Sequence, residues 1–151
     1  MRVVLDTNIL IRANPKVSPK GLARDLLLTV ASGPHVLVLS APILIEVRRV
    51  LAYPHVQARW PLTSEAIEQY LTFLATVADM VESVPPSFPV VISDPDDDPI
   101  LQTAITGHAD VLCTRDEAFR HEVVEQVCRA HNIRIVSDVA LIQELRRETR
   151  P

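Results

Sequence analysis

The sequence contains few of the residues that mark several common classes of protein. It has three glycines in 151 residues, so it carries neither a glycine-rich phosphate loop nor the GxGxxG motif of dinucleotide-binding enzymes. It has two cysteines, Cys113 and Cys128, both in apolar segments. We therefore expect two buried thiols rather than a disulfide or a zinc site.

The sequence also lacks an excess of positive charge and a long apolar run. Because the net charge is −4, any binding of nucleic acid must come from local arginines, or from metal ions that reverse the sign of an acidic pocket. No apolar run approaches the roughly 20 residues of a membrane span. Asp6 interrupts the N-terminus where a signal peptide would stay apolar. We expect a soluble, cytoplasmic protein without a membrane partner.

Apolar segments of strand length alternate with segments of helical periodicity. This alternation predicts an α/β fold with a parallel sheet and helices on both faces, and the length favours a single domain over residues 1–151. The predicted strands are residues 2–5, 35–39, 90–92, 110–114 and 132–136. The predicted helices are residues 22–31, 40–52, 61–81, 99–106, 117–131 and 137–147.

Carboxylates follow the predicted strands. Asp6 follows the first strand, the cluster SDPDDDPI (residues 93–100) follows the strand at 90–92, and Asp116 follows the strand at 110–114. Glu46 lies on the helix after the strand at 35–39. Because the carboxyl ends of parallel strands form one ligand-binding edge, we expect these four segments to meet there.

Each acid also has an ordinary structural role open to it. Asp6 and Asp116 could cap the turn or helix that follows them. Glu46 could form an ion pair with Arg48 or Arg49, and most aspartates of the cluster could form turns or caps. These roles do not explain why four segments bring carboxylates to one edge.

Clustered carboxylates repel one another, and a divalent cation resolves that conflict. Carboxylate oxygens suit Mg²⁺ or Mn²⁺, whereas the absence of His and Cys from these motifs weighs against zinc. Such a set of acids suits phosphodiester hydrolysis, in which a metal-activated water attacks phosphorus and the metal stabilises the leaving oxygen.

Four segments together resemble the PIN domain, in its order and spacing over about residues 1–120. They are VVLDTNILI, SAPILIEV, DPDDDPILQTA and ADVLCTRD, and they are most similar to the VapC-like toxins of type II toxin–antitoxin systems. The resemblance implies a three-layer α/β/α sandwich with a central, mainly parallel sheet. It also implies an endoribonuclease that needs Mg²⁺ or Mn²⁺, acts on RNA and has an antitoxin protein as partner.

The resemblance also implies roles for individual residues. Asn8 and Thr114 would orient carboxylates or waters, or else form turn and strand-end hydrogen bonds. Arg115 stands where this branch commonly has glycine, and it either contacts substrate phosphate or is simply exposed. The acids that would be catalytic and hold the metal are Asp6, Glu46, Asp116 and one aspartate of the cluster.

The register of the following helix distinguishes the clustered aspartates. Asp97 has Ile100 at the third position after it and Ala104 at the seventh, which is the family pattern and one helical stripe. Asp98 is rotated by about 100° from that stripe. We predict Asp97 as the ligand, with Asp98 as the alternative.

Two other functions stay open at this stage. A phosphatase or phosphotransferase with Asp6 as nucleophile is disfavoured, since Asn8 stands where a second Asp is expected and the only lysines are Lys16 and Lys20. A non-catalytic module on the same fold that binds nucleic acid or protein would bind no divalent metal. The apolar helical region at residues 70–81 is a candidate surface for a homodimer.

Overall fold

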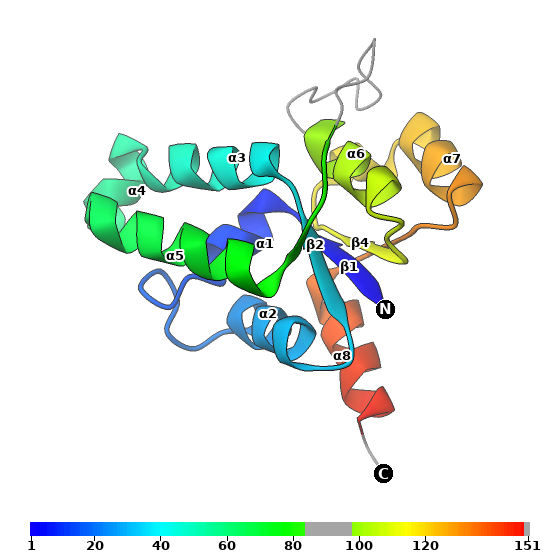
Figure 1. Cartoon of the computed structure of the whole chain (residues 1–151), viewed down its shortest axis with the longest axis horizontal. Helices are drawn as coiled ribbons and strands as arrows, with labels where there is room; N and C mark the ends of the chain where they lie inside the picture. Colours follow the sequence, from blue (N-terminus) through cyan, green and yellow to red (C-terminus); the bar gives the residue numbers. More distant parts are fainter. Residues whose placement is uncertain (84–97, 150–151) are drawn as a thin grey trace.

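A sheet of five parallel strands lies at the centre of the structure, a computed structural model that describes residues 1–83 and 98–149 (Figure 1). The strand order is β3-β2-β1-β4-β5, and each neighbouring pair is parallel. This confirms the predicted α/β class with a parallel sheet. The strands are β1 (Arg2–Leu5), β2 (Val36–Leu39), β3 (Asp79–Met80), β4 (Val111–Cys113) and β5 (Arg134–Val136).

Helices connect the strands and cover the sheet. Four of them lie within one or two residues of the predicted ranges, namely α2, α3, α6 and α8. None of the described helices is both long and apolar enough to cross a membrane. The helices are α1 (Thr7–Arg12), α2 (Leu22–Ser32), α3 (Ala41–Leu51), α4 (Pro54–Arg59), α5 (Ser64–Val77), α6 (Asp98–Thr106), the 3-10 helix η2 (Glu117–Arg120), α7 (Glu122–Ala130) and α8 (Asp138–Glu148).

The helices form layers on both faces of the sheet. On one face α2 packs against β2 and α8, whereas α6 packs against β1, β2 and β4, and α7 packs against β5. Figure 1 shows α2 and α8 on one side of the sheet and α6 and α7 on the other. The central strand β1 is buried from Val3 to Leu5, as expected for a parallel strand covered on both faces.

The direction in which the chain winds reverses between β1 and β4. The chain first adds β2 and β3 on one side of β1, and it later adds β4 and β5 on the other side. In an open parallel sheet, the carboxyl ends of the two strands at such a reversal border a crevice, because the connections leave toward opposite faces. The ends of β1 and β4 are therefore where this fold would hold a ligand.

The predicted helix at residues 61–81 was wrong at its C-terminal end. Helix α5 ends at Val77, Ala78 is extended, and Asp79–Met80 form the edge strand β3. The backbone of β3 pairs with β2, with Val38 opposite Asp79. Both β3 residues are exposed, so the sequence has no apolar alternation here that would predict a strand.

Other short elements also differ from the expectations. The six residues after Asp6 form helix α1 instead of a simple turn. The predicted continuous helix at 117–131 is divided, because His121 is extended between η2 and α7. Helix α3 ends at Leu51, and Pro54 then begins α4, which the sequence did not predict; the fixed φ of proline is favourable at this position. The strand predicted at 90–92 lies outside the described residues.

Part of the candidate dimer surface at residues 70–81 belongs to the protein's own core. Tyr70, Leu71 and Leu74 are buried, and Phe73 and Met80 are the exposed large apolar side chains of this region. A homodimer therefore stays a prediction. Both cysteines are buried free thiols, as predicted.

Ser40 connects the end of β2 to helix α6. Ser40 is the N-cap residue of α3, where a serine side chain often caps the helix, but it makes no capping hydrogen bond. Its hydroxyl instead lies 2.7 Å from the Thr103 hydroxyl, which donates to the Pro99 carbonyl at 2.6 Å. These buried contacts hold the first turn of α6 at the carboxyl edge of the sheet.

We predict that Gly107→Ala destabilises the protein by about 1–3 kcal/mol, the usual cost of overpacking a core. An added Cβ would lie 2.4 Å from Val38 Cγ1 in β2 and 2.9 Å from the Thr103 carbonyl oxygen. Urea unfolding measures the change. Gly21→Ala is the matched control, because its Cβ would meet only the movable Ser18 side chain. Equal midpoints for the two variants would contradict the prediction.

Candidate active site

Asp6 lies at the carboxyl end of the central strand and is 3% exposed. Its backbone N–H donates to the Cys113 carbonyl at 3.1 Å, which extends the pairing of β1 with β4 by one residue. Its extended backbone makes it the N-cap of α1, and its Oδ1 accepts a hydrogen bond from the Ile9 N–H at 2.9 Å. The helix cap thus fixes one oxygen of this carboxylate.

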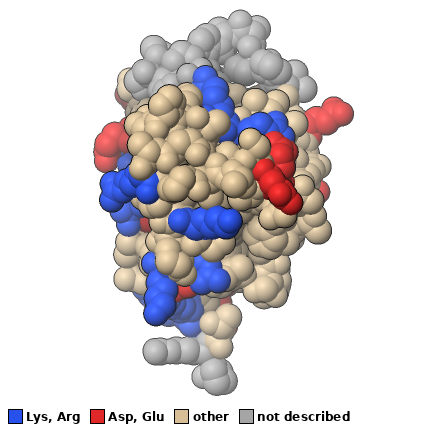
Figure 2. Space-filling model, turned by 90° about the vertical axis from the view of Figure 1, so that its left-hand side faces the viewer, with Lys and Arg blue, Asp and Glu red and all other residues tan. Residues whose placement is uncertain are grey.

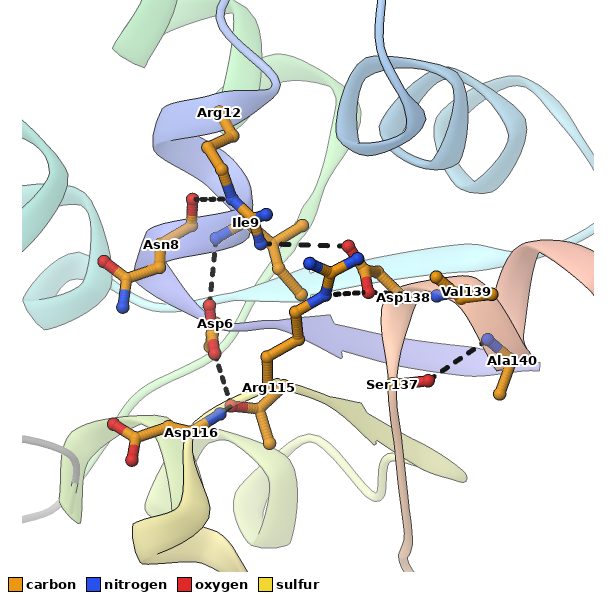
Figure 3. A network of polar contacts seen from close by, with 11 residues as sticks. Asp6, Asn8, Ile9, Arg12, Arg115, Asp116, Ser137, Asp138, Val139 and Ala140 are labelled. Carbon is orange, nitrogen blue, oxygen red and sulfur yellow. Dashed lines mark hydrogen bonds and ion pairs between the residues drawn. The ribbon is translucent and has the colours of Figure 1, made fainter.

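Thr114 fixes the other oxygen of Asp6 from the neighbouring strand. The buried Thr114 hydroxyl donates to Asp6 Oδ2 and accepts a hydrogen bond from the Asp116 N–H at 2.9 Å (Figure 3). Asp116 in turn caps η2, with its Oδ1 accepting from the Ala118 N–H at 2.9 Å. The structure therefore brings Asp6, Thr114 and Asp116 together at the reversal between β1 and β4.

Burial raises the pKa of the Asp6 carboxyl above its ordinary value, because removal from water penalises the charged form. The hydrogen bonds from Thr114 and Ile9 and the positive charge of Arg12 lower this pKa, whereas the negative charge of Asp116 raises it. The repulsion between Asp6 and Asp116 is the conflict that a cation would relieve.

Asn8 lies beside this pair on the first turn of α1 and is exposed. In Figure 3 the Asn8 amide and the Asp116 carboxylate lie on the same side of Asp6, away from Asp138. The Asn8 amide makes no side-chain hydrogen bond within the described part of the chain, and the Asn8 backbone carbonyl accepts from Arg12 Nε at 3.4 Å. Orientation of waters or carboxylates by Asn8 stays a prediction.

Glu46 lies apart from these residues, on helix α3. It forms an ion pair of 2.5 Å with Arg49, three residues along the helix, which is the structural role left open by the sequence. It also lines a cavity of about 310 Å³ with Thr7, Pro99 and Ile100, so it faces the space between α1, α3 and the start of α6. A second cavity of the same volume, between α2 and α5, contains none of the predicted site residues.

The choice between Asp97 and Asp98 lies outside what the structure describes. Asp97 is not among the described residues, and of Asp98 the structure gives only the backbone, as the first residue of α6. The contacts of Ser40 and Thr103 place that helix start at the carboxyl edge, near the cavity that Glu46 lines.

Arg115 contacts a buried acid that the sequence did not single out. Its Nε donates to Asp138 Oδ1 at 2.5 Å, and Arg12 lies 3.8 Å from Asp138 Oδ2 (Figure 3). Asp138 is 1% exposed and begins α8, two residues after the end of β5. A carboxylate within two residues of a predicted strand is the signal that identified Asp6 and Asp116, so the same rule could have found Asp138. The sequence pattern predicts only a helix over residues 137–147 at this place.

A comparison with family models places these residues in a known context. The model of the PIN domain matches residues 2–118. The chain belongs to the PIN domain family. No curated protein and no solved structure matches it.

PIN domains are generally metal-dependent nucleases, and the oxygen donors here fit a hard divalent cation. Asp6 and Asp116 both contact the Thr114 hydroxyl, Asp6 through its carboxylate and Asp116 through its backbone N–H, and Mg²⁺ typically takes one or two carboxylates together with waters and phosphate oxygens. In residues 1–83 and 98–149, no three side chains of His, Cys, Asp or Glu form a ready-made metal site. The acids of this PIN domain thus fit a cation, and further ligands would have to come from elsewhere.

We predict that Asp6→Asn raises the urea midpoint of this PIN domain at pH 7. Because the folded-state pKa of Asp6 is raised, protonation of its carboxyl favours the folded state. This stabilisation is fully present below the ordinary pKa of 3.8 and is lost as the pH rises through the folded-state pKa. The advantage of the variant should therefore shrink as the pH is lowered from 7 toward 4. Unfolding curves across this range measure it.

The control is Asp25→Asn, which changes an exposed acid of α2 paired with Arg146 at 3.6 Å. Its difference from the wild type should vary little over the same range. A lower midpoint for Asp6→Asn at pH 7 would show that the charged carboxylate stabilises the fold and would contradict the prediction.

Proposed function

We propose that the protein is a Mg²⁺- or Mn²⁺-dependent endoribonuclease that serves as the toxin of a type II toxin–antitoxin system. One observation carries the nuclease proposal: the Asp6 carboxylate is buried at the end of the central strand, close enough to Asp116 for that charge to raise its pKa. Membership of the PIN domain family supports the same activity. The toxin role and an antitoxin partner rest on the resemblance of the four motifs to VapC-like toxins.

The residues at the carboxyl edge of the sheet would have different roles in hydrolysis. Asp6 and Asp116 would hold the cation, and Thr114 would keep the Asp6 carboxylate in one orientation through its hydroxyl. A bound Mg²⁺ or Mn²⁺ supplies Lewis acidity toward the phosphodiester and lowers the pKa of an attacking water. Asn8, exposed beside these acids, would hydrogen-bond that water or the substrate.

Two further acids complete the proposed ligand set. Asp97 would reach the edge from the segment that precedes α6. Glu46 would join from the cavity between α1, α3 and α6, and its ion pair with Arg49 would orient it.

Local positive charge favours a nucleic acid as the substrate despite the net charge of −4. Figure 2 shows Lys and Arg side chains spread over the side of the molecule on which α3, α4 and α5 lie. A polyanion can be attracted by such a face, because exposed charges act only over about a Debye length. The exposed basic residues of α3, α4 and the connection between α1 and α2 are Lys16, Lys20, Arg48, Arg49 and Arg59.

We expect the purified full chain to cleave single-stranded RNA with Mg²⁺ or Mn²⁺, and EDTA to abolish the cleavage. Asp6→Asn should lower the rate by about 10²–10³-fold or more, the effect of losing one electrostatic group at a reacting centre. Gel analysis of a labelled RNA measures the rate. Asp25→Asn should cleave like the wild type, because this acid lies on α2 in a pair with Arg146.

Equal cleavage by Asp6→Asn, or cleavage that resists EDTA, would disprove the proposal. A phosphorylated Asp6 after incubation with a phosphate ester would favour the phosphatase alternative. Absence of any divalent-metal binding in calorimetry would favour a non-catalytic module.

We predict that Asp97→Asn weakens metal binding more than Asp98→Asn does. In the sequence Asp97 precedes Ile100 by three positions and Ala104 by seven, and both of these residues are buried. This helical spacing favours Asp97 over Asp98. Titration of Mn²⁺ followed by calorimetry gives both affinities. A larger loss for Asp98→Asn would reverse the assignment.

A further inference from the structure

Two arginines converge on one buried carboxylate beside the proposed catalytic acids. Asp138 is 1% exposed, whereas the side chains of Arg115 and Arg12 are 52% and 42% exposed. Arg115 Nε lies 2.5 Å from one Asp138 oxygen and Arg12 lies 3.8 Å from the other. Asp138 also accepts a hydrogen bond from the Val139 N–H at 3.0 Å. The carboxylate is thus fixed from three sides, and it holds the two guanidinium groups together.

This cluster lies at the same end of the sheet as Asp6. Arg12 is in the last turn of α1, Arg115 follows β4, and Asp138 follows β5. Cys113, the last residue of β4, lies near all four charges. Besides burial, which raises the pKa of its thiol most, Asp138 and Asp6 raise this pKa, and Arg115 and Arg12 lower it. Figure 3 shows the two guanidinium groups next to Asp138, on the opposite side of Asp6 from Asn8 and Asp116.

The cluster has guanidinium donors left over for an anion. Two guanidinium groups face the single carboxylate of Asp138, and the charge of Arg12 also acts on the neighbouring Asp6. Each guanidinium carries five N–H donors, and Arg115 uses Nε for Asp138. Planar guanidinium groups suit the bidentate recognition of phosphate.

We propose that Arg12 and Arg115 bind a backbone phosphate of single-stranded RNA next to Asp6, and that Asp138 is the positioning residue that holds both arginines for it. This inference rests on the proposed ribonuclease function and assigns the residues that hold its substrate. Asp138 acts only through the arginines and does not touch the RNA.

The matched control is Arg134, which is also an arginine in an ion pair. It is 51% exposed and pairs with Glu144 at 2.8 Å, so its exposure and pairing are close to those of Arg115. It begins β5, which places it at the amino edge of the sheet, opposite to Asp6.

The experiment measures binding of a fluorescent single-stranded RNA to the full chain by anisotropy, in EDTA and at several salt concentrations. EDTA stops metal-dependent cleavage, so binding is measured separately from hydrolysis. Arg12→Ala and Arg115→Ala should each weaken binding by roughly threefold to tenfold. Each should also reduce the slope of log affinity against log salt by about 0.7, the value for one lost phosphate contact on a single strand. Arg134→Ala should change neither quantity.

Asp138→Asn separates positioning from charge alone. This change removes a negative charge, so a purely electrostatic effect would tighten RNA binding. If Asp138 positions the arginines, the variant should bind more weakly and with a smaller salt slope. Asp138→Glu, which keeps the charge, should recover part of the affinity, and it also serves if Asp138→Asn does not fold.

The arginine site is overturned if Arg134→Ala weakens binding as much as Arg115→Ala does, or if the wild type does not bind RNA in EDTA. Tighter binding by a folded Asp138→Asn overturns the positioning role. These outcomes are distinct from failure of the proposed function: RNA that binds through Arg12 and Arg115 but is not cleaved with Mg²⁺ or Mn²⁺ would refute the nuclease alone. If RNA is cleaved but Arg12→Ala and Arg115→Ala bind it as tightly as the wild type does, this inference alone is refuted.

Discussion

The carboxylate of Asp6, buried at the end of the central strand, is the constraint on which the rest of the site depends. A carboxylate withdrawn from water is unfavourable unless donors satisfy it. Here the Ile9 N–H, from helix α1, and the Thr114 hydroxyl, from the end of β4, each take one oxygen. One side chain therefore couples the start of a helix to the end of the neighbouring strand. The reversal of winding between β1 and β4 leaves this junction at the mouth of a crevice.

These donors do not remove the cost of burying the charge, because the pKa of Asp6 stays raised and Asp116 adds to the shift. A folded protein gains nothing in stability from two acids placed so closely. Groups that oppose folding in this way are typical of sites where charge is needed for binding or chemistry. The same arrangement that disfavours the charged form of Asp6 offers oxygen donors of fixed orientation to a cation.

The sequence predicted the parts of the structure that depend on strong local patterns. The run Val3–Leu5 followed by Asp6 indicated a buried strand and an acid at its end, and both are found. It could not predict β3, since two exposed residues become a strand only through pairing with β2. Helix α1 is too short for a clear periodicity. For Glu46 the sequence left two roles open, and the pair with Arg49 is one of them.

The cluster around Asp138 was missed for a different physical reason. Its partners Arg12 and Arg115 belong to segments that are remote along the chain and meet only because β5 lies beside β4. In the sequence alone, a buried acid of this kind cannot be distinguished from an ordinary residue at a helix start, because its partners are not known.

The cluster also changes how the net charge should be interpreted. An acidic centre repels RNA, yet two arginines anchored by a buried carboxylate keep positive charge within reach of that centre and hold it in place. Because exposed charges are screened over about 10 Å, the positions of the charges at this edge, and not the sum over the chain, determine where a phosphate can approach Asp6.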